Sequence, residues 1–152
     1  MTIAVGQKAP IFNLPTDGNG MVNLSDLLGK NVVLYFYPKD NTPGCTQEAK
    51  DFKDNIKLFK DKNTVIIGVS KDNVVSHDKF KNKYELPFIL ASDEDLKTCN
   101  DYGIWVEKSM YGKKYMGIER STFIISPQGK IQNIWRKVKV KGHVNEVLEA
   151  IK

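Results

Sequence analysis

The chain has 152 residues, of which 41% are hydrophobic and 27% charged, and this composition is typical of a globular protein with a single domain. No segment approaches the roughly 18 consecutive apolar residues that a membrane-spanning helix needs, and the N-terminus lacks the charged and apolar blocks of a secretory signal. We therefore expect one domain over residues 1–152, with no membrane partner and a cytoplasmic location.

The formal net charge of +5 arises mostly from lysines that are mixed with acidic residues along the chain. The densest basic run, Arg136–Lys141, alternates lysine with valine over its second half, a pattern typical of one solvated strand face. Surface lysines that favour solubility explain this charge better than nucleic-acid binding does. His77 and His143 each stand alone, without the spacing of metal ligands, so we expect no metal site.

Predicted strands and helices alternate along the chain. Runs rich in β-branched and aromatic residues predict strands at 12–14, 32–37, 65–69, 87–90, 122–125 and 130–135. Apolar residues three and four positions apart predict helices at 43–59, 73–84, 94–102 and 144–151. Residues 17–20 and 126–129 carry turn signals, and the second turn closes a hairpin. This order predicts an α/β fold with a central mixed sheet and helices on both faces.

The segment Pro38–Glu48 joins a buried strand to an amphipathic helix, a position where open α/β sheets bind ligands. Thr42 suits the N-cap and Pro43 the first helical position, which places Cys45 third in the helix. We expect the Thr42 side-chain oxygen to accept a hydrogen bond from the first-turn amides and so to lie beside Cys45. Unpaired amides and the positive end of the helix dipole favour a thiolate and a lowered cysteine pKa here.

A reactive thiolate also needs a group that stabilises the negative charge developing on a leaving oxygen. Only two of the 23 basic residues are arginines, and one of them, Arg120, directly precedes the apolar strand at 121–125. A rigid guanidinium fork suits a site where geometry matters. Glu48, about one helical turn beyond Cys45, is placed to orient Arg120 by an ion pair; an acid near a helix start is also common for dipole reasons alone.

With these residues in view, the chain resembles the peroxiredoxins. The family pattern of proline, three residues, threonine or serine, two residues and cysteine is matched by Pro38, Thr42 and Cys45. The flanking residues Tyr35–Asp40, Thr46 and Glu48–Ala49, together with the distal segment Gly117–Ile125, are similar to the bacterioferritin comigratory protein, or Q-type, subfamily. The resemblance extends from about Gly6 to the last helix.

The resemblance implies a thioredoxin-like fold and a thiol peroxidase that reduces hydrogen peroxide and organic hydroperoxides through a cysteine sulfenic acid. It implies that Pro38 shields the sulfur, Thr42 binds the peroxide, Cys45 is the peroxidatic nucleophile and Arg120 stabilises the thiolate and the transition state. It also implies no cofactor, a thiol reductant such as thioredoxin, and a monomer or weak dimer.

One position departs from the subfamily. Many members carry a resolving cysteine five residues after the nucleophile, where this chain has Lys50. We therefore predict a cycle with one cysteine, in which an external thiol attacks the sulfenic acid. Cys99 is the other cysteine, and it is either a buried structural residue in a stripe with Leu96 and Tyr102 or a resolving thiol reached by local unfolding.

Two other functions use the same cysteine. Thiol–disulfide exchange suits the fold, but Thr42 stands where a Cys-x-x-Cys motif requires its other cysteine. A redox sensor or holdase would use oxidation of Cys45 as a switch. Trp105 and the polar segment 108–117 are either a wall of the site or a surface loop, and we assign them no catalytic role.

Overall fold

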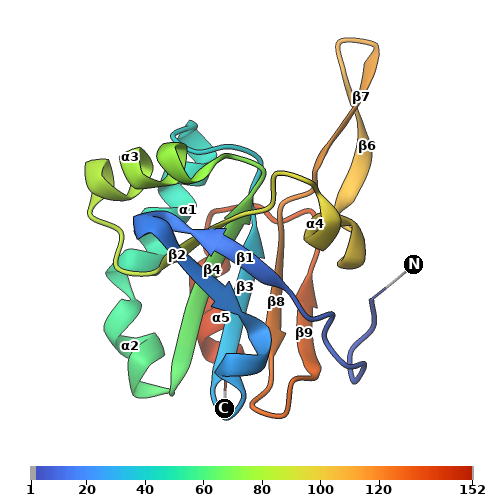
Figure 1. Cartoon of the computed structure of the whole chain (residues 1–152). Helices are drawn as coiled ribbons and strands as arrows, with labels where there is room; N and C mark the ends of the chain where they lie inside the picture. Colours follow the sequence, from blue (N-terminus) through green and yellow to red (C-terminus); the bar gives the residue numbers. More distant parts are fainter. Residues whose placement is uncertain (1–2, 152) are drawn as a thin grey trace.

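The computed structural model describes residues 3–151 of the chain. It has a seven-stranded mixed sheet, in the order β2-β1-β5-β4-β3-β8-β9, and a separate hairpin formed by β6 and β7 (Figure 1). The strands are β1 (Asn13–Thr16), β2 (Gly20–Asn23), β3 (Asn31–Phe36), β4 (Thr64–Ser70), β5 (Ile89–Ser92), β6 (Trp105–Met110), β7 (Lys113–Ile118), β8 (Ser121–Ile125) and β9 (Ile131–Trp135). The helices are α1 (Pro43–Asp54), α2 (Ile56–Asp61), α3 (Val74–Tyr84), α4 (Lys97–Asp101) and α5 (His143–Ala150), with short 3-10 helices η1 (Asp17–Asn19) and η2 (Leu24–Leu27).

Strand β3 lies inside the sheet, parallel to β4 on one side and antiparallel to β8 on the other. Side chains alternate between the faces of a strand, so the continuous apolar run of β3 buries residues on both sides. Val32, Leu34 and Phe36 belong to one hydrophobic cluster, whereas Val33 and Tyr35 belong to a second cluster on the opposite face. The predicted mixed sheet with a doubly buried strand is therefore confirmed.

Helices contribute to the clusters on both faces, as predicted. Helices α1, α2, α3 and α5 place apolar residues in the cluster that contains Tyr35. Helix α4 places Cys99 in the cluster on the other face, where the N-terminal segment and η2 also pack. No helix within residues 3–151 is long and apolar enough to cross a membrane.

Two predicted helices differ in extent from the structure. The helix expected at 43–59 is divided at Asn55, whose ψ of 10° lies outside the helical range and separates α1 from α2. The helix expected at 94–102 is reduced to α4, because Leu96 adopts the left-handed conformation with φ 64°. Apolar periodicity continues across both breaks, so the sequence pattern alone did not locate them.

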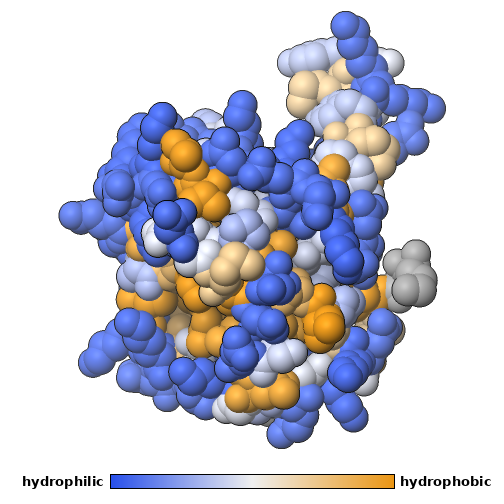
Figure 2. Space-filling model, in the orientation of Figure 1, coloured by the Kyte–Doolittle hydropathy of each residue, from blue (hydrophilic) through white to orange (hydrophobic). Residues whose placement is uncertain are grey.

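The segment after Ile104 forms strands rather than a loop. Strands β6 and β7 pair through a turn in which Tyr111 and Gly112 both have positive φ, of 52° and 77°, as a two-residue hairpin turn requires. The hairpin stands away from the body of the molecule, and its surface mixes hydrophilic and hydrophobic residues (Figure 2). The strand pattern proposed for Arg136–Lys141 was wrong: this run is irregular, and Lys137 has φ 49°.

Candidate active site

Cys45 lies in the first turn of α1, the helix that follows β3. The helix begins at Pro43 with Thr42 at the N-cap, and only 2% of Cys45 is exposed. The amide of Thr46 donates to the carbonyl of Thr42 at 2.8 Å, the first hydrogen bond of the helix. The amides of Gly44 and Cys45 precede this bond, so the helix offers them no acceptor and they leave positive partial charge beside the sulfur.

The Thr42 side chain does not cap the helix, and the expected contact with a first-turn amide was wrong. Its hydroxyl instead donates to the carbonyl oxygen of Lys39, 2.9 Å away, within the loop that joins β3 to α1. The hydroxyl donates its proton to this loop carbonyl, and its oxygen keeps lone pairs that can accept from another donor. Thr42 is therefore held by the loop rather than by the helix end.

Arg120 reaches the sulfur from the chain between β7 and β8. Its Nη2 lies 3.4 Å from Cys45 Sγ, and its Nη1 donates to Glu48 Oε1 at 2.7 Å. The guanidinium thus contacts both residues across one turn of α1, and the predicted juxtaposition of Cys45, Arg120 and Glu48 is present. Gly44 makes this approach possible, because a Cβ there would lie 3.2 Å from Arg120 Nη2.

Glu48 is fully buried beneath this contact. Burial raises the pKa of Glu48 to about 7, while the neighbouring Arg120 charge lowers it by less. Burial opposes the charge of Arg120, but Glu48 and Cys45 together raise the pKa of the guanidinium above its ordinary value. The Glu48 Oε2 atom and the Tyr35 hydroxyl are buried without a hydrogen-bond partner among the described residues. Arg120 is therefore a cation whose position is fixed by its ion pair with Glu48. The positive charge of Arg120 in turn favours the ionised form of the buried Glu48 carboxyl group.

The remaining predicted residues lie at different distances from this centre. Pro38 follows Tyr37 at the end of β3 and is half-buried at the entrance to the loop. Lys108, on the hairpin strand β6, was not singled out by the sequence. Burial and the charge of Arg120 lower the pKa of Lys108, and Cys45 acts in the opposite sense. No sequence signal marks this lysine, because the segment has the composition of a polar loop.

Cys99 does not join the site. It is fully buried in the cluster of Leu34 and Phe36, whereas Cys45 belongs to the cluster on the other face of the sheet. Burial raises the pKa of the Cys99 thiol far above its ordinary value, and Asp93 adds to this effect. Both cysteines are free. Within residues 3–151, no group of three His, Cys, Asp or Glu side chains could hold a metal ion.

Comparison with known proteins identifies this arrangement. Residues 5–134 match the AhpC/TSA family. The chain is 53% identical over 152 residues to Peroxiredoxin Bcp of Bacillus subtilis, with 100% of this chain and 97% of that protein covered. It is 40% identical over 150 residues to Peroxiredoxin Bcp of Escherichia coli, with 99% of this chain and 96% of that protein covered. The chain belongs to the peroxiredoxin family.

A solved structure of a bacterioferritin comigratory protein supports the same assignment for the fold. The Xanthomonas campestris protein, studied for its alkyl peroxide reduction activity, superposes with a TM-score of 0.92 at 42% identity and covers 97% of each chain. The predicted thioredoxin-like fold and the resemblance to the Q-type subfamily are therefore confirmed. This peroxiredoxin is a thiol peroxidase, as the sequence motif predicted.

Proposed function

We propose that the Cys45 thiolate attacks the terminal oxygen of a peroxide and that Arg120 and Thr42 stabilise the reacting oxygens. The observation that carries this proposal is the position of Arg120, 3.4 Å from Cys45 Sγ and bound to Glu48 at 2.7 Å. A cation fixed there favours the thiolate and meets the negative charge that develops on the leaving oxygen. The Thr42 hydroxyl oxygen has lone pairs that accept a hydrogen bond from a small substrate, and the first-turn amides donate hydrogen bonds to it.

The reaction transfers two electrons from sulfur to the peroxide. The sulfur–oxygen bond forms as the oxygen–oxygen bond breaks, and the leaving oxygen takes a proton to become water or an alcohol. Cys45 is left as a sulfenic acid. Pro38, at the loop entrance, shields the sulfur from solvent, which agrees with its half-buried position and the 2% exposure of Cys45.

An external thiol then completes a cycle that uses one cysteine of this chain. The thiol attacks the sulfenic acid, water leaves, and a second thiol reduces the resulting mixed disulfide. Two features support this route: position 50 is a lysine on the exposed face of α1, and Cys99 is buried on the opposite face of the sheet. Thioredoxin or a similar thiol is the reductant that this chemistry needs.

The substrate class follows from the relatives. The Xanthomonas campestris protein is described by its alkyl peroxide reduction, and we extend this activity to hydrogen peroxide and organic hydroperoxides for this chain. Two free cysteines suit the reducing cytoplasm, where thiol reductants are available. We propose a single domain over residues 1–152 that acts as a monomer or weak dimer.

The test is to add one equivalent of hydrogen peroxide to the reduced protein, followed by a sulfenic-acid trap and mapping by mass spectrometry. We expect an adduct on Cys45, with Cys99 still a free thiol. Cys45→Ser should abolish peroxide turnover, because no second thiol contacts Arg120. Substantial turnover by this variant, or no rapid change at Cys45 in the wild-type chain, would reject the assignment.

A further inference from the structure

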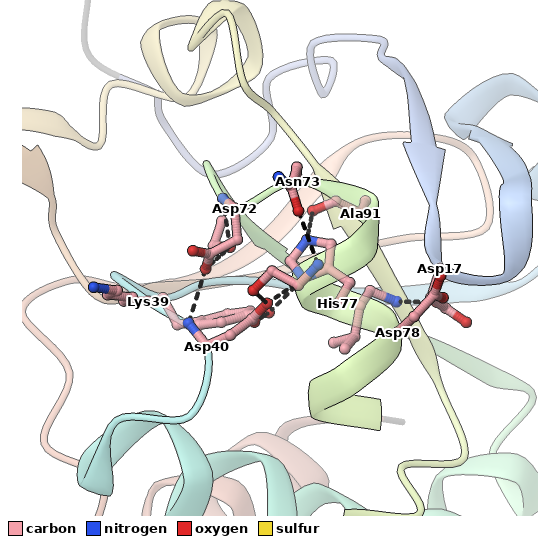
Figure 3. Close-up of polar contacts among 12 residues, drawn as sticks. Asp17, Lys39, Asp40, Asp72, Asn73, His77, Asp78 and Ala91 are labelled. Carbon is pink, nitrogen blue, oxygen red and sulfur yellow. Dashed lines mark hydrogen bonds and ion pairs between the residues drawn. The ribbon is translucent and has the colours of Figure 1, made fainter. Parts of the chain in front are cut away.

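A buried polar network lies beneath the loop that carries Pro38 and Thr42 (Figure 3). Its centre is Asp40, a loop residue only 7% exposed. The Asp40 carboxylate accepts hydrogen bonds from the Tyr37 hydroxyl at 2.5 Å and the Ser76 hydroxyl at 2.8 Å. Its Oδ2 also lies 2.8 Å from Nδ1 of His77, which α3 presents to the loop. A buried carboxylate with three polar partners is part of the packed interior and is not a solvated surface charge.

His77 is fully buried, and both of its ring nitrogens face acceptors. Nε2 lies 3.0 Å from the carbonyl oxygen of Ala91 in β5, and a carbonyl can only accept, so Nε2 carries a proton. A neutral ring with this tautomer would turn the lone pair of Nδ1 toward Asp40 at 2.8 Å. The contact is favourable only if the pair shares an additional proton. That proton lies between Nδ1 and Oδ2, so a charge-assisted hydrogen bond joins the two side chains.

The network holds the loop that the proposed reaction uses. The backbone amide of Asp40 donates to Asp72 Oδ2 at 2.8 Å, so the loop is tied to the chain after β4 as well as to α3. One residue earlier, the carbonyl of Lys39 accepts the hydroxyl of Thr42. The position of the Thr42 side chain therefore depends on a loop whose central residue is fixed by His77.

We propose that His77 is a positioning residue of the peroxidase, which acts through its hydrogen bond with Asp40 to hold the Pro38–Thr42 loop in the form that binds peroxide. This inference rests on the proposed function, because it concerns the same reaction. Among the charged or titratable groups near the pair are Tyr37, directly after β3, and Asp72 in the chain after β4. Lys79 and Lys83 of α3 line the same surface pocket as Asp40. Ser76 and the Ala91 carbonyl complete the polar surroundings.

Two substitutions separate the two contacts of the ring. In His77→Asn the side-chain amide takes the place of Nδ1 and donates to Asp40, but the Ala91 carbonyl loses its donor. In His77→Gln the amide takes the place of Nε2 and donates to Ala91, but Asp40 loses its partner. Each variant loses one buried hydrogen bond, so each should unfold at a lower urea concentration than the wild-type chain.

The rate of Cys45 oxidation by hydrogen peroxide distinguishes positioning from stability. His77→Gln should lower the second-order rate constant by about tenfold to a hundredfold, the effect of a small displacement of a substrate-binding group. His77→Asn, which keeps a hydrogen-bond donor to Asp40, should lower the rate constant less than His77→Gln does. Alkylation of Cys45 by iodoacetamide, which does not use the peroxide-binding groups, should not slow in either variant. Equal rate constants for the two variants, or parallel losses in peroxide reaction and alkylation, would overturn the proposal.

A measurement on the wild-type chain covers the case in which neither variant folds. In ¹⁵N NMR spectra of the wild-type chain, both ring nitrogens of His77 should show hydrogen bonding, Nε2 to the Ala91 carbonyl and Nδ1 to Asp40; a ring with the signals of a solvent-exposed imidazole would overturn the network. The wild-type reaction is measured in the same series. If Cys45 of the wild-type chain does not react with peroxide, the proposed function fails, whereas equal rates for His77→Gln and the wild-type chain reject this inference alone.

Discussion

Gly44 is the residue whose missing side chain admits Arg120 to the sulfur. A Cβ at this position would lie 3.2 Å from Arg120 Nη2, so Gly44→Ala requires the guanidinium to move by a few tenths of an ångström. Alanine is a better helix former than glycine, by about 1 kcal/mol in a helix interior, so the variant should be at least as stable as the wild-type chain. We expect the rate constant for Cys45 oxidation to fall by about threefold to tenfold.

The matched control for Gly44→Ala is Gln47→Ala, an exposed position about one turn further along α1 whose side chain donates to Asp51. Peroxide kinetics and urea unfolding are measured for both variants. A lower rate constant without lower stability would locate the effect at the guanidinium. An unchanged rate constant in Gly44→Ala would show that Arg120 does not need its observed distance from the sulfur.

Glu48 gives the stability of the fold a pH dependence that can be measured. Burial raises its pKa from 4.5 to about 7, against the lowering effect of Arg120. A carboxyl group with a raised pKa stabilises the fold below its unfolded value and loses that contribution as the pH rises through the folded value. Relative to Glu48→Gln, the free energy of unfolding of the wild-type chain should fall by about 2 to 3 kcal/mol between about pH 4.5 and about pH 8. Urea unfolding of both proteins at several pH values tests this, and a constant difference would contradict it.

Most strands of the large sheet were predictable because burial imposes apolar runs on their sequences, but the mostly exposed edge strand β2 was not predicted. The run at 32–37 corresponds to β3, and the run at 122–125 lies within β8, because both strands pack on two faces. The helix start at Pro43 was also predictable, since threonine and proline suit those positions. The break at Asn55 was not, because α1 and α2 keep the same apolar periodicity on either side of it.

The hairpin of β6 and β7 escaped prediction because its strands have little to bury. Most of its residues are exposed or half-buried, so no alternation of apolar and polar residues marks it as a sheet. Met110, Tyr111 and Met116 are at least half exposed. An isolated two-stranded hairpin is only marginally stable in water, so its order depends on the base near Trp105 and Ile118, which packs on the body.

Amide hydrogen exchange should separate the hairpin from the sheet. We expect the hydrogen-bonded amides near the Tyr111–Gly112 turn to exchange much faster than those of β3, since local opening of the hairpin does not disturb either hydrophobic cluster. Amides close to Trp105 should be intermediate. Exchange of the turn-proximal amides at the rate of β3 would contradict a locally unstable hairpin and would indicate that it opens only when the whole chain unfolds.

At the scale of the whole molecule, the sequence identified the reacting groups but not the contacts that join distant segments. Cys45, Arg120 and Glu48 carried local signals, namely a helix start, a rare arginine and a helical spacing. Asp40 and His77 carried none, because 37 positions separate them and their contact depends on how α3 packs beside the loop. The face of the sheet on which each cysteine packs likewise depends on the assembled fold and carries no local sequence signal.

The placement of the cysteines predicts how the oxidised enzyme behaves. A disulfide requires Cα atoms within about 7 Å, but Cys45 and Cys99 are buried in hydrophobic clusters on opposite faces of the sheet, so the bond cannot form in the folded conformation. Cys99→Ser should therefore retain wild-type turnover with an external thiol. Both proteins should lose activity at the same rate under excess peroxide, as the sulfenic acid passes to the sulfinic acid.

Steady-state kinetics, mass spectrometry and non-reducing peptide mapping test this last prediction. The expected products after excess peroxide are a sulfinic acid on Cys45 and an intact Cys99 thiol in the wild-type chain. A Cys45–Cys99 disulfide that forms faster than the chain unfolds would contradict it. That result would make Cys99 the resolving residue and would require local unfolding around the cysteines in each catalytic cycle.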